Sequence, residues 1–161
     1  DETEQLLLKG PAIGNTFDDV KLLDKKDTYD NANISCGAFT ETDDVLQSVE
    51  MNLDLTVTPE FPYNWMYAGR NGKREAFERN ITCKSLVMVF KDSGETDAAK
   101  AEVYVDGKWV RTADPFENGW LHCNPILIHK GKETKEHNVR IQVSEGDEEK
   151  KFTILGFGYV E

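Results

Sequence analysis

The sequence predicts a single all-β unit, most simply an antiparallel β-sandwich. Short runs rich in β-branched and aromatic residues are separated by turn residues at intervals of roughly 10 to 15 residues. Almost no stretch has the 3.6-residue periodicity of an amphipathic helix. The chain has 161 residues, of which 39% are hydrophobic and 30% are charged. This length suits one domain with its own core.

Ten runs have the composition of strands: residues 5–9, 20–23, 34–40, 54–58, 78–90, 101–105, 109–112, 124–129, 137–143 and 152–160. Only residues 42–53 are compatible with a helix, because Thr42, Asp43 and Asp44 supply a capping residue and acids for its first turn. The alternation that follows them would equally suit a strand. We expect residues 1–14 to form an N-terminal extension or linker with the first strand, and residues 15–161 to form one β-sandwich module.

Residues 101–111 give the clearest local prediction. Asp106 and Gly107 separate two alternating runs, and an Asp-Gly pair is the strongest short-range signal for a two-residue hairpin turn. A regular hairpin would pair Val105 with Lys108, Tyr104 with Trp109, Val103 with Val110, and Glu102 with Arg111. Alternation would turn the three valines toward the core and the other face, with Glu102, Tyr104, Trp109 and Arg111, outward. The two rings would then form a half-exposed platform.

Two further clusters combine rings with polar groups. Residues 120–124 would place Trp120, His122 and Asn124 on one face of a strand. Residues 61–67 lie between proline and glycine and are expected to form a loop; they include Asn64, Trp65 and Tyr67. A single ring is more often core or sheet cover than a ligand platform. Three such clusters in one small domain nevertheless favour at least one binding surface.

Charge limits the classes of partner. The chain carries 19 basic and 30 acidic residues, which gives a net charge of −11. A polyanion such as a nucleic acid would be repelled, and the basic residues are interspersed rather than clustered. If the ligand is a large polymer, a neutral one fits best. No apolar run approaches the roughly 20 residues of a membrane span, and residues 1–5 lack the pattern of an export signal.

The three cysteines do not fix the compartment. Cys36, Cys83 and Cys123 are odd in number and match no zinc-binding spacing. Buried thiols are the favoured interpretation, and one disulfide is the alternative.

Catalytic motifs are missing from the sequence. It has no Gly-x-Ser-x-Gly elbow, no His-Glu-x-x-His and no phosphate-binding glycine loop. The three histidines, His122, His129 and His137, are expected to be satisfied or solvated side chains near strand ends. We therefore expect no enzyme activity from this chain.

A resemblance is carried by residues 58–66, 82–86, 90–93, 101–108, 112–115, 119–124 and 152–159. In order and spacing these runs resemble the accessory module of bacterial SGNH/GDSL-type carbohydrate esterases, a galactose-binding-like β-sandwich. The resemblance covers roughly three quarters of the chain. It implies a jelly-roll fold that is not itself the hydrolase, because the nucleophile motif and the Asp-x-x-His block of the esterase do not occur here.

The resemblance implies a non-catalytic carbohydrate-binding module for neutral plant cell-wall polysaccharide, such as β-glucan, xyloglucan or another hemicellulose. It would be a monomer attached to the catalytic domain of a larger secreted bacterial enzyme, which it would hold near its substrate. Its candidate binding residues are Trp65, Trp109, Trp120, Tyr67, Tyr104, Asn64, His122 and Asn124.

Two points stay open at the level of sequence. The module could instead be a structural domain that packs on an esterase domain without binding glycan alone. Modules of this fold can also hold a structural calcium ion, and Asp18, Asp19 and Asp24 lie near the first strands. No ligand spacing supports any of these acids, so none is assigned, and no other cofactor is expected.

Overall fold

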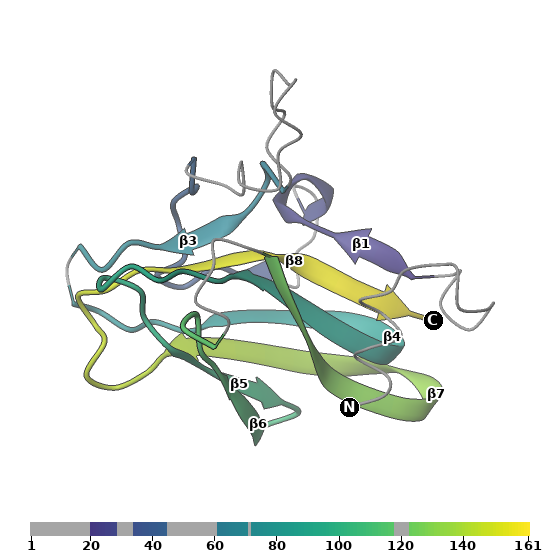
Figure 1. Cartoon of the computed structure of the whole chain (residues 1–161). Coiled ribbons are helices and arrows are strands. Elements are labelled where there is room, and N and C mark those ends of the chain that lie inside the picture. The colour runs from purple at the N-terminus through teal and green to yellow at the C-terminus, as the bar shows by residue number, and fades with distance from the viewer. Residues whose placement is uncertain (1–19, 29–33, 45–60, 71, 118–122) are drawn as a thin grey trace.

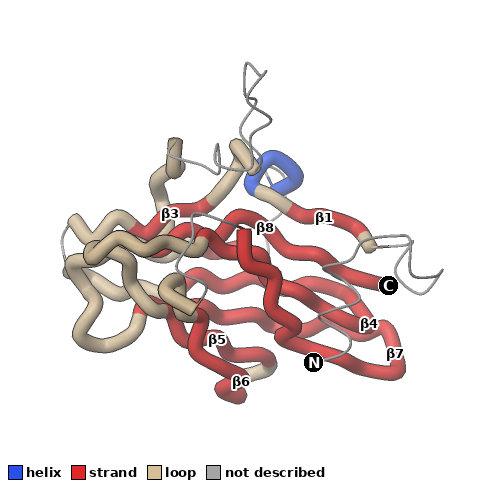
Figure 2. Tube along the Cα trace, viewed as in Figure 1, coloured by secondary structure: helices blue, strands red, loops and turns tan. Residues whose placement is uncertain are grey.

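The computed structural model describes residues 20–28, 34–44, 61–70, 72–117 and 123–161, and these residues are mainly antiparallel β-structure (Figure 1, Figure 2). The strands are β1 (Lys21–Leu23), β2 (Ile34–Ser35), β3 (Trp65–Tyr67), β4 (Phe77–Lys91), β5 (Ala101–Val105), β6 (Lys108–Ala113), β7 (Cys123–Val143) and β8 (Phe152–Val160). Within these ranges the one helical element is a 3-10 turn, η3 (Lys25–Thr28), and none of their helices is long and apolar enough to cross a membrane.

The strands form one continuous ladder in the order β1-β8-β4-β7-β5-β6, with β2 paired to β4 and β3 paired to β8. Figure 1 shows β1 and β3 on one side of β8, and the β5–β6 hairpin on the far side of β7. The long strand β4 pairs with β7 from Phe77 to Lys91, with register shifts between Cys83 and Ser85 and between Leu86 and Val87. The predicted all-β sandwich class is confirmed.

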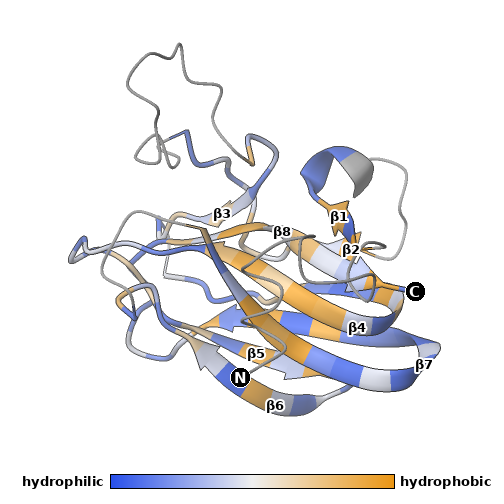
Figure 3. Ribbon diagram, turned by 45° about the vertical axis from the view of Figure 1, so that its right-hand side comes forward, coloured by the Kyte–Doolittle hydropathy of each residue, from blue (hydrophilic) through white to orange (hydrophobic). Residues whose placement is uncertain are grey.

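The first register shift changes which side chains of β4 face the core. Before the shift, the odd-numbered residues Phe77, Ile81 and Cys83 belong to the main core cluster. Beyond it, the even-numbered residues Leu86 and Met88 belong to that cluster. The odd-numbered Val87 and Val89 instead join Leu155 in a second cluster on the opposite face. Both faces of β4 are therefore apolar beyond this shift, whereas its first half keeps an outward polar face. Much of β7 is hydrophilic (Figure 3).

Aromatic rings fill the main core. Seven of them are at most 2% exposed: Phe39, Trp65, Tyr67, Phe77, Phe90, Phe152 and Phe157. The Trp65 and Phe77 ring centroids are 5.1 Å apart, and those of Phe77 and Phe157 are 5.9 Å apart. The expectation of a loop around Trp65 is wrong, because Trp65–Tyr67 forms β3 and pairs with β8.

Most predicted strands are confirmed within a residue or two. β5 and β8 have the predicted bounds, and β4 and β6 are slightly longer than expected. The two runs 124–129 and 137–143 are the ends of the single strand β7. The run 34–40 is a strand only at Ile34–Ser35, because Gly37 turns the chain with a φ of 51°. Runs 5–9 and 54–58 lie outside the described residues.

The predicted helix 42–53 is described only at its start. Residues 42–44 have no helical structure there, and Glu41 before them forms an isolated bridge with Met66. The remainder of that run lies outside the described residues.

The β5–β6 hairpin confirms the turn but not the whole register. Asp106 and Gly107 both have positive φ, 53° and 78°, and Tyr104 lies opposite Trp109. A register shift between Val103 and Tyr104 then pairs Val103 with Arg111 and Glu102 with Thr112. The predicted pairs of Val103 with Val110 and of Glu102 with Arg111 are wrong, because Val110 is an extra residue in β6, a β-bulge.

The structure has no disulfide between the three cysteines. The favoured interpretation of buried thiols is confirmed only for Cys83, because Cys36 and Cys123 are half-buried. Cys83 is fully buried, and this burial, together with the nearby Asp106 charge, raises the pKa of its thiol to about 11. Such a thiol is a poor nucleophile at neutral pH, because the thiolate is the reactive form.

Candidate functional site

One line of side chains crosses five neighbouring strands on the outward face of the sheet. The register pairs Ser35 with Glu78, Glu78 with Arg140, Arg140 with Tyr104, and Tyr104 with Trp109. These five residues, which we call the aromatic row, alternate with buried neighbours such as Arg79 and Val103. The alternation of β-strands therefore places all five on the same face.

Neighbours within the aromatic row contact one another. The Nε of Arg140 lies 3.6 Å from Oε1 of Glu78. The guanidinium carbon of Arg140 lies 5.4 Å from the ring centroid of Tyr104, within the range of a cation–π contact. Trp109, at the end of the row, is 60% exposed. The row thus combines one open ring face with polar groups held in place.

Glu102, next to the row on β5, holds the Trp109 indole. Its Oε1 accepts hydrogen bonds from Trp109 Nε1 at 2.9 Å and from Thr112 Oγ1 at 2.6 Å. Its Oε2 accepts one from the Ser144 hydroxyl. Burial by itself would raise the pKa of Glu102, but the hydrogen bonds from Ser144, Thr112 and Trp109 lower it below the ordinary value. The carboxylate is a fixed acceptor that orients the indole.

Amide side chains flank the row on the same face. Asn138 Nδ2 donates to Asn80 Oδ1 at 3.0 Å, and these two residues lie two positions along β7 and β4 from Arg140 and Glu78. Gln142 Nε2 donates to the carbonyl of Arg74 at 2.6 Å. Hydroxyl-rich ligands need such donors and acceptors around an apolar contact.

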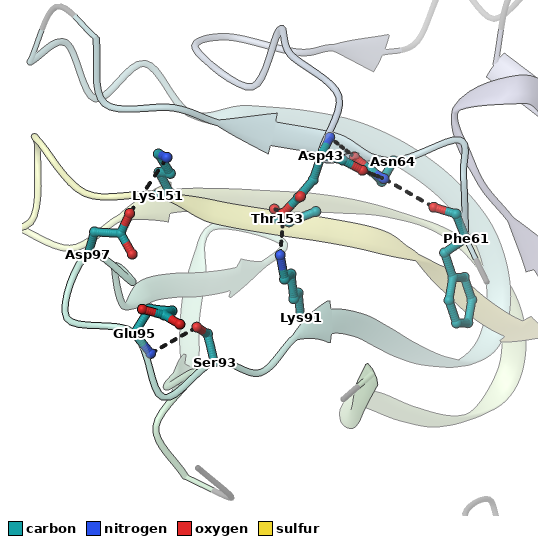
Figure 4. Close-up of polar contacts among 9 residues, drawn as sticks. All are labelled: Asp43, Phe61, Asn64, Lys91, Ser93, Glu95, Asp97, Lys151 and Thr153. Atoms are coloured by element: carbon teal, nitrogen blue, oxygen red, sulfur yellow. Dashed lines mark hydrogen bonds and ion pairs between the residues drawn. The ribbon is translucent and has the colours of Figure 1, made fainter. Parts of the chain in front are cut away.

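A hollow of about 530 Å³ lies at one end of the sandwich, and we call it the end hollow. Its centre is a buried network drawn in Figure 4. Asp43 Oδ2 accepts from Lys91 Nζ at 2.9 Å and from Thr153 Oγ1 at 2.7 Å. The side chains of Asp43 and Lys91 are only 10% and 13% exposed. A buried ion pair of this kind needs every partner in place, because each charge has lost its water.

Asn64 positions that network rather than facing solvent. It is fully buried, its Oδ1 accepts from the backbone N–H of Asp43 at 2.8 Å, and its Nδ2 donates to the Asp43 carbonyl at 3.1 Å. A third bond joins Nδ2 to the carbonyl of Phe61 at 3.1 Å (Figure 4). Asn64 therefore fixes the backbone of Asp43.

The rim of the end hollow carries charges of both signs. Arg70 donates to both carboxylate oxygens of Glu41, at 2.7 and 2.8 Å, which lowers the pKa of Glu41. Lys151 Nζ lies 3.6 Å from Asp97 Oδ2. These groups compensate one another, so the hollow offers polar contacts but no open ring.

The structure separates the eight predicted binding residues. Trp109 and Tyr104 lie together on the aromatic row. Trp65 and Tyr67 are 1% and 2% exposed, so they present no ring face to a ligand, and we reassign them to the core. The Tyr67 hydroxyl instead donates to the Glu148 carbonyl at 2.6 Å.

The predicted polar residues are also divided. Asn64 and Asn124 are 0% and 7% exposed, and Asn124 Nδ2 donates to Asp92 Oδ1 at 3.0 Å. Both act inside the fold, so direct contact with a ligand is not retained for them. Trp120 and His122 lie outside the described residues.

Sequence reasoning missed three members of the aromatic row, Ser35, Glu78 and Arg140, and both members of the buried ion pair, Asp43 and Lys91. Alternation along residues 137–143 is compatible with an outward Arg140, but it does not identify the neighbours of Arg140 across the strands. No sequence signal joins Asp43 to Lys91, because they meet through tertiary structure.

The described residues contain no group of three or more His, Cys, Asp or Glu side chains that could hold a metal ion. Of the acids considered for calcium, Asp24 accepts from the backbone N–H of Lys26 at 2.8 Å, while Asp18 and Asp19 lie outside the described ranges. His137 contacts Asp106 at 2.6 Å through Nδ1 and packs against the His129 ring, with centroids 4.0 Å apart.

No family model matches the chain, and no curated protein matches it. Its fold is similar to that of a two-domain esterase active on acetylated mannans and co-crystallised with mannopentaose, with a TM-score of 0.62 and 20% identity over 94% of this chain and 40% of that one. It is also similar to a family 35 carbohydrate-binding module from an environmental isolate, with a TM-score of 0.51 and 12% identity over 85% of this chain and 90% of the module.

A third similar structure is an acetyl xylan esterase from the rumen bacterium Butyrivibrio proteoclasticus, with a TM-score of 0.51 and 11% identity over 87% of this chain and 32% of the esterase. This chain thus spans well under half of each esterase but matches a carbohydrate-binding module nearly end to end. The resemblance to the β-sandwich modules of carbohydrate esterases is confirmed at the level of fold.

Proposed function

We propose that the protein is a non-catalytic carbohydrate-binding module that holds a neutral plant cell-wall polysaccharide, a β-glucan or hemicellulose, against its aromatic row. The observation that carries the proposal is Trp109, which is 60% exposed and whose indole is fixed by the Glu102 carboxylate. An oriented ring stacks on the C–H face of a sugar without losing much conformational entropy on binding.

The similar structures support this proposal. One is itself a carbohydrate-binding module, and two are esterases in which a domain of this fold occupies about a third of the chain. A module of this kind would keep an attached secreted bacterial esterase close to its substrate, since tethering raises the effective concentration without new chemistry. We assign no catalytic residue to it.

Affinity electrophoresis against xyloglucan, glucomannan, xylan and hydroxyethylcellulose tests the proposal. The parent protein should be retarded by at least one of them. Trp109→Ala should weaken that binding by roughly five- to 150-fold, since a stacking contact contributes about 1 to 3 kcal/mol. Tyr63→Ala is the matched control, because Tyr63 is also exposed, at 43%, but lies off the row. If none of the four polymers retards the parent protein, the proposal is wrong.

A second candidate function is a structural domain that packs against an esterase catalytic domain. The two-domain esterase favours it, because this chain matches only 40% of that protein. The aromatic row would then be covered by roughly 600 to 1,500 Å² of domain interface. This function predicts that the chain co-elutes with a separately expressed esterase domain and that Trp109→Ala blocks the co-elution. It also predicts that no polysaccharide retards the chain.

A further inference from the structure

The aromatic row crosses five strands, with one residue on each strand. Each of its members lies directly opposite the next in the register, from Ser35 on β2 through Glu78, Arg140 and Tyr104 to Trp109 on β6. Directly opposed residues in an antiparallel sheet share a face and a line. The sheet therefore presents one position per strand along this line.

The spacing of the row is close to that of a polysaccharide. Neighbouring strands are about 4.8 Å apart, so five strands extend the row over about 19 Å. The repeat of a β-1,4-linked pyranose chain is close to this strand spacing. A chain that lies along the row would thus place about one sugar residue over each strand.

In the part of the chain that the structure describes, neither end of the row is covered by a further strand. Within the described residues, β6 pairs only with β5 and β2 pairs only with β4, so no further strand extends the face beyond Trp109 or Ser35. Ser35 and Trp109 are both exposed. A ligand can therefore continue past either end of the row, which an enclosed pocket for a chain terminus would prevent.

The row is also close to electrically neutral. The carboxylate of Glu78 lies 3.6 Å from the Arg140 guanidinium, so one charge offsets the other and both can bond to hydroxyl groups. Fixed acceptors and donors next to an exposed indole match a neutral, hydroxyl-bearing chain and not an ionic one.

We propose that the aromatic row binds an internal segment of about five sugar residues of a β-1,4-linked polysaccharide, with the glycan perpendicular to the strands and the chain end not recognised. This inference rests on the proposed function of the same surface, and it adds the orientation, length and mode of recognition of the ligand.

Calorimetric titration with manno- and cello-oligosaccharides of increasing length tests the inference. For the series that binds, affinity should rise from the disaccharide to about the pentasaccharide and then level off. Borohydride reduction of the terminal sugar of the hexasaccharide should leave its affinity within about twofold of the pentasaccharide, because the reduced unit no longer presents a ring.

Glu78→Gln separates the two ends of the row. We expect it to weaken hexasaccharide binding several-fold and to leave disaccharide binding at Trp109 unchanged, whereas Trp109→Ala weakens both. Glu133→Gln is the matched control, because Glu133 also pairs with a cation, Lys135 at 3.5 Å, but lies off the row.

The outcomes distinguish this inference from the proposed function. Affinity that levels off at the disaccharide, loss of binding on reduction, or unchanged hexasaccharide binding by Glu78→Gln would each overturn the internal, cross-strand mode while leaving glycan binding intact. Failure of every oligosaccharide and every polymer to bind would instead overturn the proposed function.

Discussion

Glu102 links the chemistry of a single side chain to the shape of the proposed binding surface. Three neutral donors converge on its carboxylate, from Trp109, Thr112 and Ser144. An ionised acceptor strengthens such bonds relative to a neutral one. The orientation of the exposed indole therefore depends on Glu102 remaining charged.

This dependence predicts how glycan retention responds to pH. Burial raises the pKa of Glu102, but the three hydrogen bonds outweigh it, so the folded-state pKa lies below the ordinary value. The stabilisation is thus fully present above about pH 4.3 and lost as the pH falls through the lower, folded-state pKa. Retardation by the bound polysaccharide should be constant from about pH 7 to pH 5 and decline only in stronger acid. A decline that begins near pH 6 would contradict this.

Removal of one member of the Asp43–Lys91 ion pair should cause a large loss of stability. Lys91→Met leaves the Asp43 carboxylate with 10% side-chain exposure and only Thr153 among the partners described above. Removing one member of a buried ion pair costs about 3 to 5 kcal/mol, measured as the free energy of unfolding in urea. The double variant Asp43→Asn with Lys91→Met is the control, and it should recover part of the loss. Equal stability of the parent and Lys91→Met would refute this role.

At the scale of elements, sequence patterns predicted strands and one turn well. The Asp106-Gly107 turn was predictable because few residue pairs tolerate two positive φ values, and β5 was predictable from its alternation. The extra residue Val110 was not, since a bulge depends on how β6 meets the other strands. The two halves of β7 also look separate in sequence, because the charged residues between them interrupt the apolar pattern.

The candidate site was predicted only where ring exposure follows from local alternation. Tyr104 and Trp109 belong to one hairpin, so their shared face could be derived. Trp65 could not be assigned in this way, because its burial depends on Phe77 and Phe157, which are distant in sequence. Composition gives the same signal for a core ring and a surface ring.

Two glycines that both need a positive φ should differ in how much stability their replacement by alanine costs. Gly37 and Gly107 both have positive φ, so alanine is strained at each by about 1 kcal/mol. A Cβ on Gly37 would meet the Ala76 carbonyl oxygen at 2.1 Å, whereas on Gly107 it would meet nothing within 4 Å. Gly37→Ala should therefore lower the thermal midpoint far more than Gly107→Ala. Equal shifts would show that the backbone around Gly37 relaxes without cost.

At the scale of the whole molecule, the net charge of −11 predicts the behaviour toward ionic polymers. Binding of a neutral glycan releases no counterions, so retardation by the bound neutral polysaccharide should change less than about twofold between low and high salt. Polygalacturonate should not retard the protein at low salt, where repulsion is strongest. Retardation by polygalacturonate that disappears with added salt would contradict the preference for neutral ligands.

The bulge at Val110 decides which side chains of β6 face Glu102. Trp109 and Thr112 are three positions apart, a spacing that places residues on opposite faces of an uninterrupted strand. The extra residue lets both reach Glu102. Deleting Val110 would leave Glu102 opposite Thr112 and put Trp109 and Thr112 two positions apart, so both would still face Glu102. A one-residue slip of β6 that removes the bulge without a deletion would instead put Arg111 opposite Glu102 and exchange a neutral donor for a charged one. This edge of the sheet therefore tolerates a shorter strand better than a shifted one.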